Sequence, residues 1–364
     1  MQTAYHKKGL MTLVAILAAI AFLTPAQAFE LKISGQVNQM IMGADNGYDS
    51  EIFIADNDNS STRFRFIGEH ELSWVTPGFN IEFEAQRNAS DTLDIGNNSD
   101  GGFDWNDRWL EAYFKTDYGK LSIGKGSGAA DNTSEVDLSG TTVINYAGVN
   151  DTAGGFTWTS KNGTKITRGG SDLSINMTRN DFDGLGRNER LRYDSPEFFG
   201  VTLAGSATNG GAWELGSFYA VDFKDFGKLA AGLGYVDTKN REIAGIRLDF
   251  KQWGGSVSWL HPIGANVTLS LGQRNQKTGT KSDNGYVKFG WKFLKIHAAS
   301  IEYGRTEDLD LAGDKSSNIG LGYVITPWQG VEFYGSARSY SFSQSGGPNP
   351  EDIKQVMAGT RIKF

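Results

Sequence analysis

The sequence of 364 residues has no cysteine, four histidines, seven prolines and, after Leu23, no long apolar run. Without cysteine the fold cannot be held by disulfide bonds, so the chain must bury surface or close a sheet instead. The histidines are scattered and lack metal-binding spacing, so we expect no metal and no cofactor. The lack of long apolar runs does not exclude a membrane barrel, because only every second residue of a barrel strand faces lipid.

Positive charge is also in deficit, with 35 Lys and Arg against 42 Asp and Glu. Two of the lysines, Lys7 and Lys8, precede the apolar stretch 10–23 and the small-x-small motif Ala26-Gln27-Ala28. This pattern predicts a cleaved signal peptide over residues 1–28, since the stretch is shorter than the roughly 20 residues of a spanning helix. The remaining chain then has a formal charge of 33 − 42 = −9. That acidity argues against nucleic acid as a partner.

Residues 29–364 show the period-two alternation of β-strands almost throughout. Arg63 and Arg65 alternate with Phe64 and Phe66, for example. The final strand, 355–364, places one set of side chains on one face and another on the opposite face: Val356, Ala358, Thr360, Ile362 and Phe364, against Met357, Gly359, Arg361 and Lys363.

Short and long connections alternate between these segments. The long ones are polar, and we expect them at 43–60, 91–106, 306–316 and 341–351. Most short ones contain Gly or Pro, which suit tight reversals; we expect them at 76–80, 117–120, 196–200, 225–228, 262–266, 293–296 and 327–330. Tight turns at one end and longer loops at the other are typical of outer-membrane barrels.

Seven short turns define fourteen strands, and one more at each terminus gives sixteen. The sequence therefore predicts an all-β, transmembrane antiparallel barrel as a single domain over 29–364. One connection, 127–187, is far longer than the others, and such loops are usually functional or structured. In a barrel the apolar faces contact lipid, and aromatic residues near the strand ends suit the membrane interfaces.

Several segments carry a family resemblance. The segment 56–66 resembles the second strand of proteobacterial general porins. The strand, turn and strand of 108–124 resemble the part of those porins before their third loop, and the stretch 124–131 resembles the entry into that loop. The terminal Phe364 resembles the signal that the outer-membrane assembly machinery recognises. The resemblance covers essentially the whole chain after residue 28.

The resemblance implies a homotrimer in the outer membrane, whose long third loop folds into the lumen and faces a wall of arginines. The field between them would orient dipolar solutes and set ion preference. Strict alternation turns Arg87 outward, and Lys32 on the first strand is a further basic candidate. The candidate residues are Arg63, Arg65, Arg108, Arg190 and Arg192 on the wall, and Asp131, Glu135, Asp137 and Asp151 in the loop.

These features favour a channel for passive diffusion of ions and small hydrophilic solutes. A substrate-selective channel for sugars or anions is the alternative within the same fold. A barrel enzyme would need a Ser/His/acid set, and neither His70 nor His297 adjoins a recognisable nucleophile motif. A secreted soluble β-protein would have no need of a terminal aromatic residue.

Overall fold

The computed structural model describes residues 29–97, 103–239, 241–243, 246–277 and 279–364; the expected signal peptide, 1–28, lies outside them. One antiparallel sheet closes on itself, because the first strand, β1 (Glu30–Asp45), pairs with the last, β21 (Ile353–Lys363). In this seam Val37 lies opposite Ile362. The prediction that the final strand pairs with the first is confirmed, and the barrel has no open edge.

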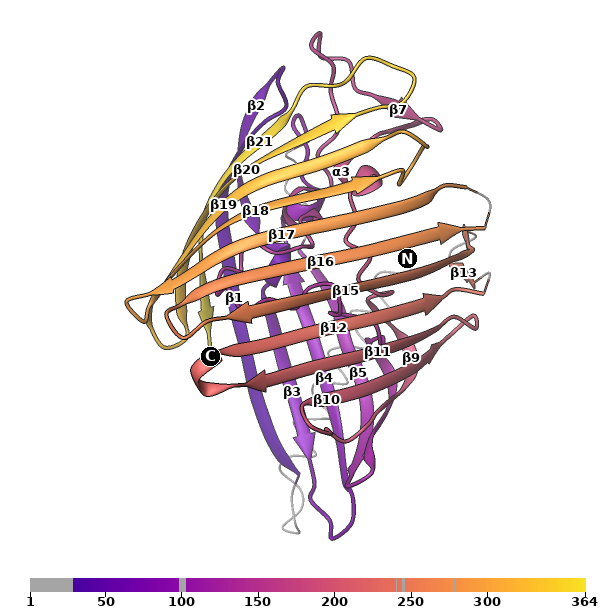
Figure 1. Ribbon diagram of the computed structural model, residues 1–364, viewed down its shortest axis with the longest axis vertical. Coiled ribbons are helices and arrows are strands. Elements are labelled where there is room, and N and C mark those ends of the chain that lie inside the picture. The colour runs from indigo at the N-terminus through magenta and orange to yellow at the C-terminus, as the bar shows by residue number, and fades with distance from the viewer. Residues whose placement is uncertain (1–28, 98–102, 240, 244–245, 278) are drawn as a thin grey trace.

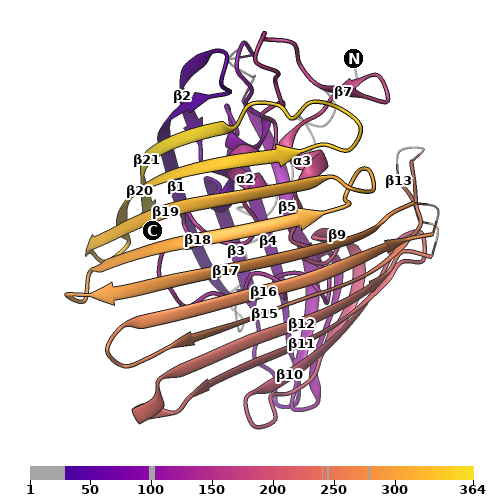
Figure 2. The same ribbon diagram turned by 45° about the horizontal axis from the view of Figure 1, so that its top comes forward.

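Sixteen strands form the wall, as predicted. β2 (Ser50–Asp56) and β3 (Arg63–Glu69) both pair with β1 and are two parts of one strand, separated by the 3-10 turn η1 (Asp58–Ser60). The other wall strands are β4 (Thr76–Gln86), β5 (Asp104–Thr116), β6 (Gly119–Ser127), β9 (Arg187–Asp194), β10 (Val201–Thr208), β11 (Trp213–Asp222), β12 (Lys228–Asp237), β15 (Phe250–Leu260), β16 (Ala265–Gln276), β17 (Lys281–Phe293), β18 (His297–Glu307), β19 (Lys315–Trp328) and β20 (Val331–Ser343). Figures 1 and 2 show these strands winding steeply round the barrel.

Seven short turns join strand pairs at one end, and six of them fall where the sequence predicts. The expected turn at 76–80 is wrong, because these residues begin β4 and the reversal occurs at 70–75 instead. Pro77 is tolerated near the strand end, where its carbonyl accepts a hydrogen bond from the amide of His70 at 3.0 Å. Gly78 leaves room for Tyr113, whose ring would lie 2.5 Å from a Cβ at that position.

The expected loop at 43–60 is also wrong for most of its length. β1 continues to Asp45, and β2 returns beside it after a four-residue turn at 46–49. The Asn46 side chain accepts the amides of Tyr48 and Asp49 at 3.1 and 2.9 Å, which closes this turn locally. The polar composition therefore conceals a hairpin that extends the wall beyond its neighbours.

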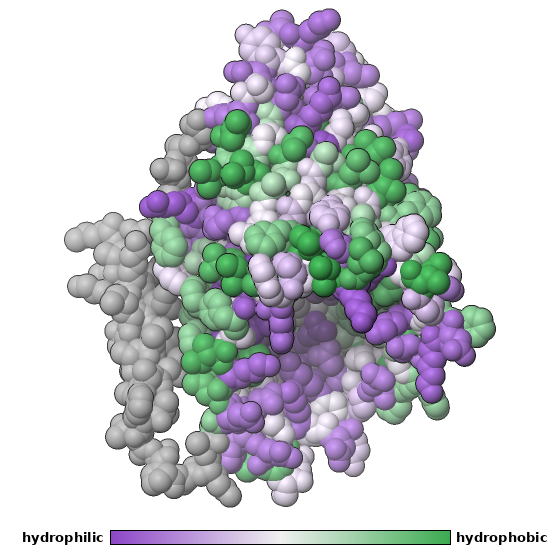
Figure 3. Space-filling view, turned by 90° about the vertical axis from the view of Figure 1, so that its left-hand side faces the viewer, coloured by the Kyte–Doolittle hydropathy of each residue, from purple (hydrophilic) through white to green (hydrophobic). Residues whose placement is uncertain are grey.

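The two faces of the wall differ in polarity. On β16, Val267, Leu269 and Leu271 alternate with the buried side chains of Thr268 and Ser270. In a closed barrel the buried set faces inward, so the apolar set forms the outer surface. Figure 3 shows hydrophobic residues gathered across the middle of one outer face, with hydrophilic residues above, below and around a hollow.

Many aromatic side chains lie near strand ends, as the sequence predicts, and a group of them lies at the end with the short turns. They are largely exposed, and Phe199 is 99% exposed. This is the arrangement expected at a membrane interface. Among the described helices, none is long and apolar enough to cross a membrane. The exposed aromatic residues of this end include Trp74, Tyr118, Phe198, Phe226, Trp291 and Trp328.

The hydrophobic core joins the inner faces of β1, β2 and β19–β21 to part of the connection between β6 and β9. Trp158 of this connection is fully buried and stacks on Phe342 of β20, with ring centroids 5.2 Å apart. The connection contains the short helices α2 (Asn150–Ala153) and α3 (Ile175–Thr178) and the small hairpin of β7 (Thr167–Arg168) and β8 (Ser171–Asp172). A second small hairpin, β13 (Arg241–Ile243) with β14 (Ile246–Leu248), follows β12.

Candidate functional site

Three of the predicted arginines meet at one point of the inner face. Glu82 of β4 is fully buried and pairs with Arg63 and Arg65 of β3 and Arg108 of β5. The Nε atoms of Arg65 and Arg108 lie 2.6 and 2.8 Å from its carboxylate oxygens. Arg108 also pairs with Glu84. The cluster therefore contains three cations and two carboxylates, and the two glutamates neutralise most of the positive charge of the arginines.

The local backbone explains why Arg108 joins this cluster. Glu82 lies opposite Trp109 and Phe83 lies opposite Asp107, so Arg108 is the extra residue of a β-bulge. A bulge re-aims the side chain that it carries. The alternation of β4 places Glu82 and Glu84 on the inner face, which the sequence predicts, but their pairing with the arginines is not visible in any sequence motif.

The other two predicted arginines lie on β9 and hold the start of the long connection. Arg190 is 5% exposed, pairs with Glu111 and donates to the carbonyl of Ser127 at 3.0 Å. Arg192 pairs with Asp194 and donates to the carbonyl of Gly128 at 2.7 Å. Among the described residues, no ion pair or hydrogen bond links these two arginines to the cluster around Glu82.

The segment 128–186 contacts the inner face at many points. The amides of Val136 and Leu138 donate to the hydroxyls of Ser256 and Ser258 on β15, at 2.8 and 2.9 Å. Farther along, the side chain of Asn145 accepts from Ser336 of β20 at 2.7 Å. These contacts follow the wall from β15 to β20.

Two buried arginines add stronger anchors. Arg338 of β20 pairs with Glu302 at 2.8 Å and donates to the carbonyl of Ile144 at 3.0 Å. Arg179 of the segment is 1% exposed and donates to Thr306 of β18 at 2.6 Å. Such charge-assisted hydrogen bonds are roughly twice as strong as neutral ones.

Two of the predicted acids, Glu135 and Asp151, lie together with Asp181. They line a cavity of about 220 Å³, along with Arg179 and several backbone segments. Asp151 accepts a hydrogen bond from the hydroxyl of Tyr146. None of the three carboxyl groups forms an ion pair with a described residue, although Arg179 lines the same cavity.

The other two predicted acids have different surroundings. Asp137 forms a buried ion pair with Lys288 of β17, at 2.6 Å. Asp131 lies near Asp183, whose pKa it helps to raise. The carboxylate of Asp183 accepts the amides of Asn132 and Ser134 at 2.6 and 2.7 Å.

The sequence reasoning missed Asp181 and Asp183. A signal was present, because the two aspartates flank Phe182 with strand-like alternation shortly before β9. Phe182 is fully buried, and a Cβ on Gly272 of β16 would lie 3.1 Å from its Cβ. The burial of this phenylalanine positions the two carboxylates beside it.

Burial and mutual repulsion weaken the acidity of this group. Burial, followed by the charges of Asp183, Asp181 and Asp151, raises the pKa of Glu135 well above its usual value. Burial also raises the pKa of Asp151 to about 8. These carboxyl groups therefore bind protons near neutral pH and become more negative as the pH rises. In the part of the chain that the structure describes, no group of His, Cys, Asp and Glu side chains is arranged to hold a metal ion.

The two remaining basic candidates, Lys32 and Arg87, have exposed side chains. The Arg87 amide donates to Asp56 at 2.7 Å, while its guanidinium has no ion pair with a described residue. Neither residue joins the cluster around Glu82.

A closed antiparallel barrel with an apolar outer surface and a charged inner face defines an outer-membrane channel protein. The model of the family described as Gram-negative porin matches residues 13–361. The chain belongs to this family, and a search among curated proteins found no match.

Solved porin structures share the fold. The anion-selective porin from Comamonas acidovorans is 17% identical, with a TM-score of 0.65 over 92% of this chain and 100% of that chain. OmpT of Vibrio cholerae is 13% identical, with a TM-score of 0.60 over 94% of this chain and 100% of that one. A mutant of the Rhodopseudomonas blastica porin is 14% identical, with a TM-score of 0.57 over 92% and 100%. These likenesses concern the fold.

Proposed function

We propose that this protein is a diffusion channel for ions and small hydrophilic solutes, and that the segment 128–186 lies in its lumen and restricts its width. The amides of Val136 and Leu138 donate to inner-face serines, and the side chain of Asn145 accepts from a third, which supports this placement. The buried stack of Trp158 on Phe342 supports it farther along β20, the strand that also carries Ser336.

At a pH above about 8, where Asp151 ionises, the channel prefers cations. The observation that carries this proposal is the unequal pairing of charge. Arg63, Arg65 and Arg108 are paired with glutamates, whereas Glu135 and Asp151 have no cationic partner within ion-pair distance among the described residues. An unpaired charge contributes to the field that a passing ion experiences, while a paired charge largely cancels.

Reversal potentials in a salt gradient test this preference. The double variant Glu135→Gln/Asp151→Asn should shift the selectivity of a reconstituted channel toward anions. Asp225→Asn, at an exposed short turn, removes one charge far along the chain from the segment and serves as the control. An unchanged reversal potential in the double variant at a pH above 8 would contradict the placement of these acids beside the ion path.

A homotrimer is the assembly that we propose, with insertion by the outer-membrane assembly machinery after removal of residues 1–28. A trimer form is recorded for OmpT of Vibrio cholerae, at 14% identity. A sugar-selective or anion-selective channel is the second candidate, supported by the shared fold of the anion-selective porin from Comamonas acidovorans.

A further inference from the structure

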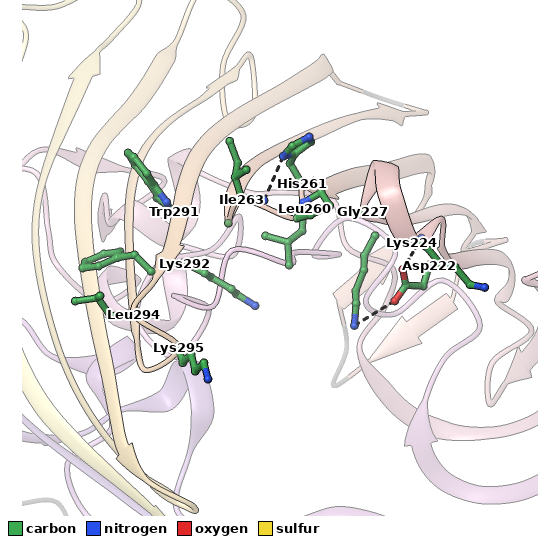
Figure 4. A pocket seen from close by; sticks show the side chains of 14 residues that line it. Asp222, Lys224, Gly227, Leu260, His261, Ile263, Trp291, Lys292, Leu294 and Lys295 are labelled. Carbon is green, nitrogen blue, oxygen red and sulfur yellow. Dashed lines mark hydrogen bonds and ion pairs between the residues drawn. The ribbon is translucent and has the colours of Figure 1, made fainter.

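A second charged region lies at the end of the barrel with the short turns, away from the carboxylates described above. The turns between β11 and β12, β15 and β16, and β17 and β18 surround a cavity of about 680 Å³ (Figure 4). Its charged lining consists of one carboxylate, Asp222, and four lysines: Lys224, Lys228, Lys292 and Lys295. Positive charge is therefore in clear excess.

Most of this positive charge is unpaired. Lys228 lies 3.7 Å from Asp222, a loose contact between two exposed groups. In the described part of the chain, no carboxylate lies within ion-pair distance of Lys292 or Lys295. Figure 4 shows the side chains of Lys292 and Lys295 directed into the space between the turns, whereas Lys224 points away from it.

The position of Lys292 connects the cavity with the interior of the barrel. Lys292 has the same parity on β17 as Lys288, which pairs with Asp137, so both belong to the inner face. A Cβ placed on Gly140 would lie 2.7 Å from Cε and 3.5 Å from Nζ of Lys292. The lysine therefore lies against the segment 128–186, near the short-turn end of the inner face.

We infer that this cavity binds a phosphate group, held by the ammonium groups of Lys228, Lys292 and Lys295. Lysine binds phosphate as a compact point charge with rotatable donors. Several such charges in one cavity favour an anion with two or more charges over chloride, because attraction grows with the product of the charges. The volume is many times the roughly 30 Å³ share of one water molecule, so a phosphate ester also fits.

Two sources of phosphate are compatible with the lining. One is a soluble phosphate that enters the mouth of the barrel. The other is the headgroup of an anionic phospholipid, since Ile263, Trp291 and Leu294 of the same cavity are exposed apolar residues that suit a bilayer interface. The chemistry of recognition is the same for both.

Binding is tested first without transport, by calorimetric titration of inorganic phosphate into the detergent-solubilised full chain. Lys228→Gln/Lys292→Gln should weaken binding about tenfold, at roughly threefold per exposed charge. Lys281→Gln removes the same charge from the opposite end of β17 and should leave binding unchanged. Equal affinity in the wild type and the double variant, or no heat from the wild type, would overturn the inference.

A second measurement separates the two sources and rests on the proposed channel function. In bilayers of zwitterionic lipid, phosphate added on the short-turn side should reduce the current in the wild type more than in Lys228→Gln/Lys292→Gln. If a phospholipid headgroup occupies the site, the wild type and the double variant should respond equally to phosphate in bilayers that contain phosphatidylglycerol. If the wild type conducts, but phosphate neither binds in the titration nor reduces the current, the phosphate site alone is refuted. If the folded protein gives no conductance, the channel proposal is refuted.

Discussion

The buried ion pair between Asp137 and Lys288 offers the sharpest test of how the segment 128–186 is held. Lys288 is fully buried and its side chain lies 2.6 Å from Asp137. Its ammonium group also donates to the carbonyl of Asn145 at 2.5 Å. One cation on β17 therefore fastens the segment at two points eight residues apart.

Replacing Lys288 with Met leaves the carboxylate of Asp137 buried without its cation. Removing one partner of a buried pair costs about 3–5 kcal/mol. The adjoining anchors at Ser256, Ser258 and Ser336 remain, so we expect local opening of 131–145 rather than loss of the barrel. Since about 1.4 kcal/mol corresponds to a factor of ten, exchange by local opening should accelerate by about a hundredfold or more.

The assay is hydrogen exchange of the amides of Val136 and Leu138, with single-channel current recorded in parallel. The current of Lys288→Met should be noisier than that of the wild type. The double variant Asp137→Leu/Lys288→Met removes both charges, so it should recover most of the protection and lose only about 1 kcal/mol for the bond to Asn145. Protection in Lys288→Met equal to the wild type, or a double variant as labile as the single one, would refute the reasoning.

Four further predictions concern charge, stability and assembly. The double variant Arg63→Glu/Arg65→Glu should move the permeability ratio toward cations. An unchanged ratio would show that these two arginines do not lie beside the ion path. Asp151, with a pKa raised to about 8, is protonated at neutral pH, so cation preference measured by reversal potential should increase between about pH 7 and 9. Because the folded protein holds the proton of Asp151 more tightly than the unfolded chain does, the free energy of unfolding should fall as the pH rises from the ordinary pKa of 3.8 to about 8. Thermal unfolding at pH 5 and pH 9 measures this loss. Deleting Phe364 should reduce surface insertion in cells more than it reduces the conductance of barrels that do assemble; normal insertion would count against its role as an assembly signal.

The barrel could be predicted from the sequence because its determinants are local. Alternation on each strand sets which side chains face outward, and the short turns set the hairpins. The turn at 76–80 was misplaced because Pro77 and Gly78 are typical turn residues, while the contact of Gly78 with Tyr113 that favours the strand is long-range. The polar stretch 43–60 conceals a hairpin for the same reason, since its pairing with β1 depends on register rather than composition.

The long segment was less predictable, because its order comes from packing against distant strands. Residues 156–159 and 173–178 look strand-like, and Thr157 does form a β-bridge with Ser174, but Ile175 begins a helix. The stack of Trp158 on Phe342 joins residues 184 positions apart, which no local pattern indicates. The inward positions of Arg63 and Arg65 could be predicted by parity, but the pairing of Arg108 with Glu82 and Glu84 depends on a bulge.

The central claim is that the folded protein forms a water-filled channel, and conductance in a planar bilayer tests it most directly. Purified protein with intact β-structure should insert to give stepwise increases in current, grouped in threes for a trimer. The Glu135→Gln/Asp151→Asn variant should insert equally well, with altered selectivity at a pH above about 8. Folded protein that enters the bilayer and gives no steps in current would contradict the account.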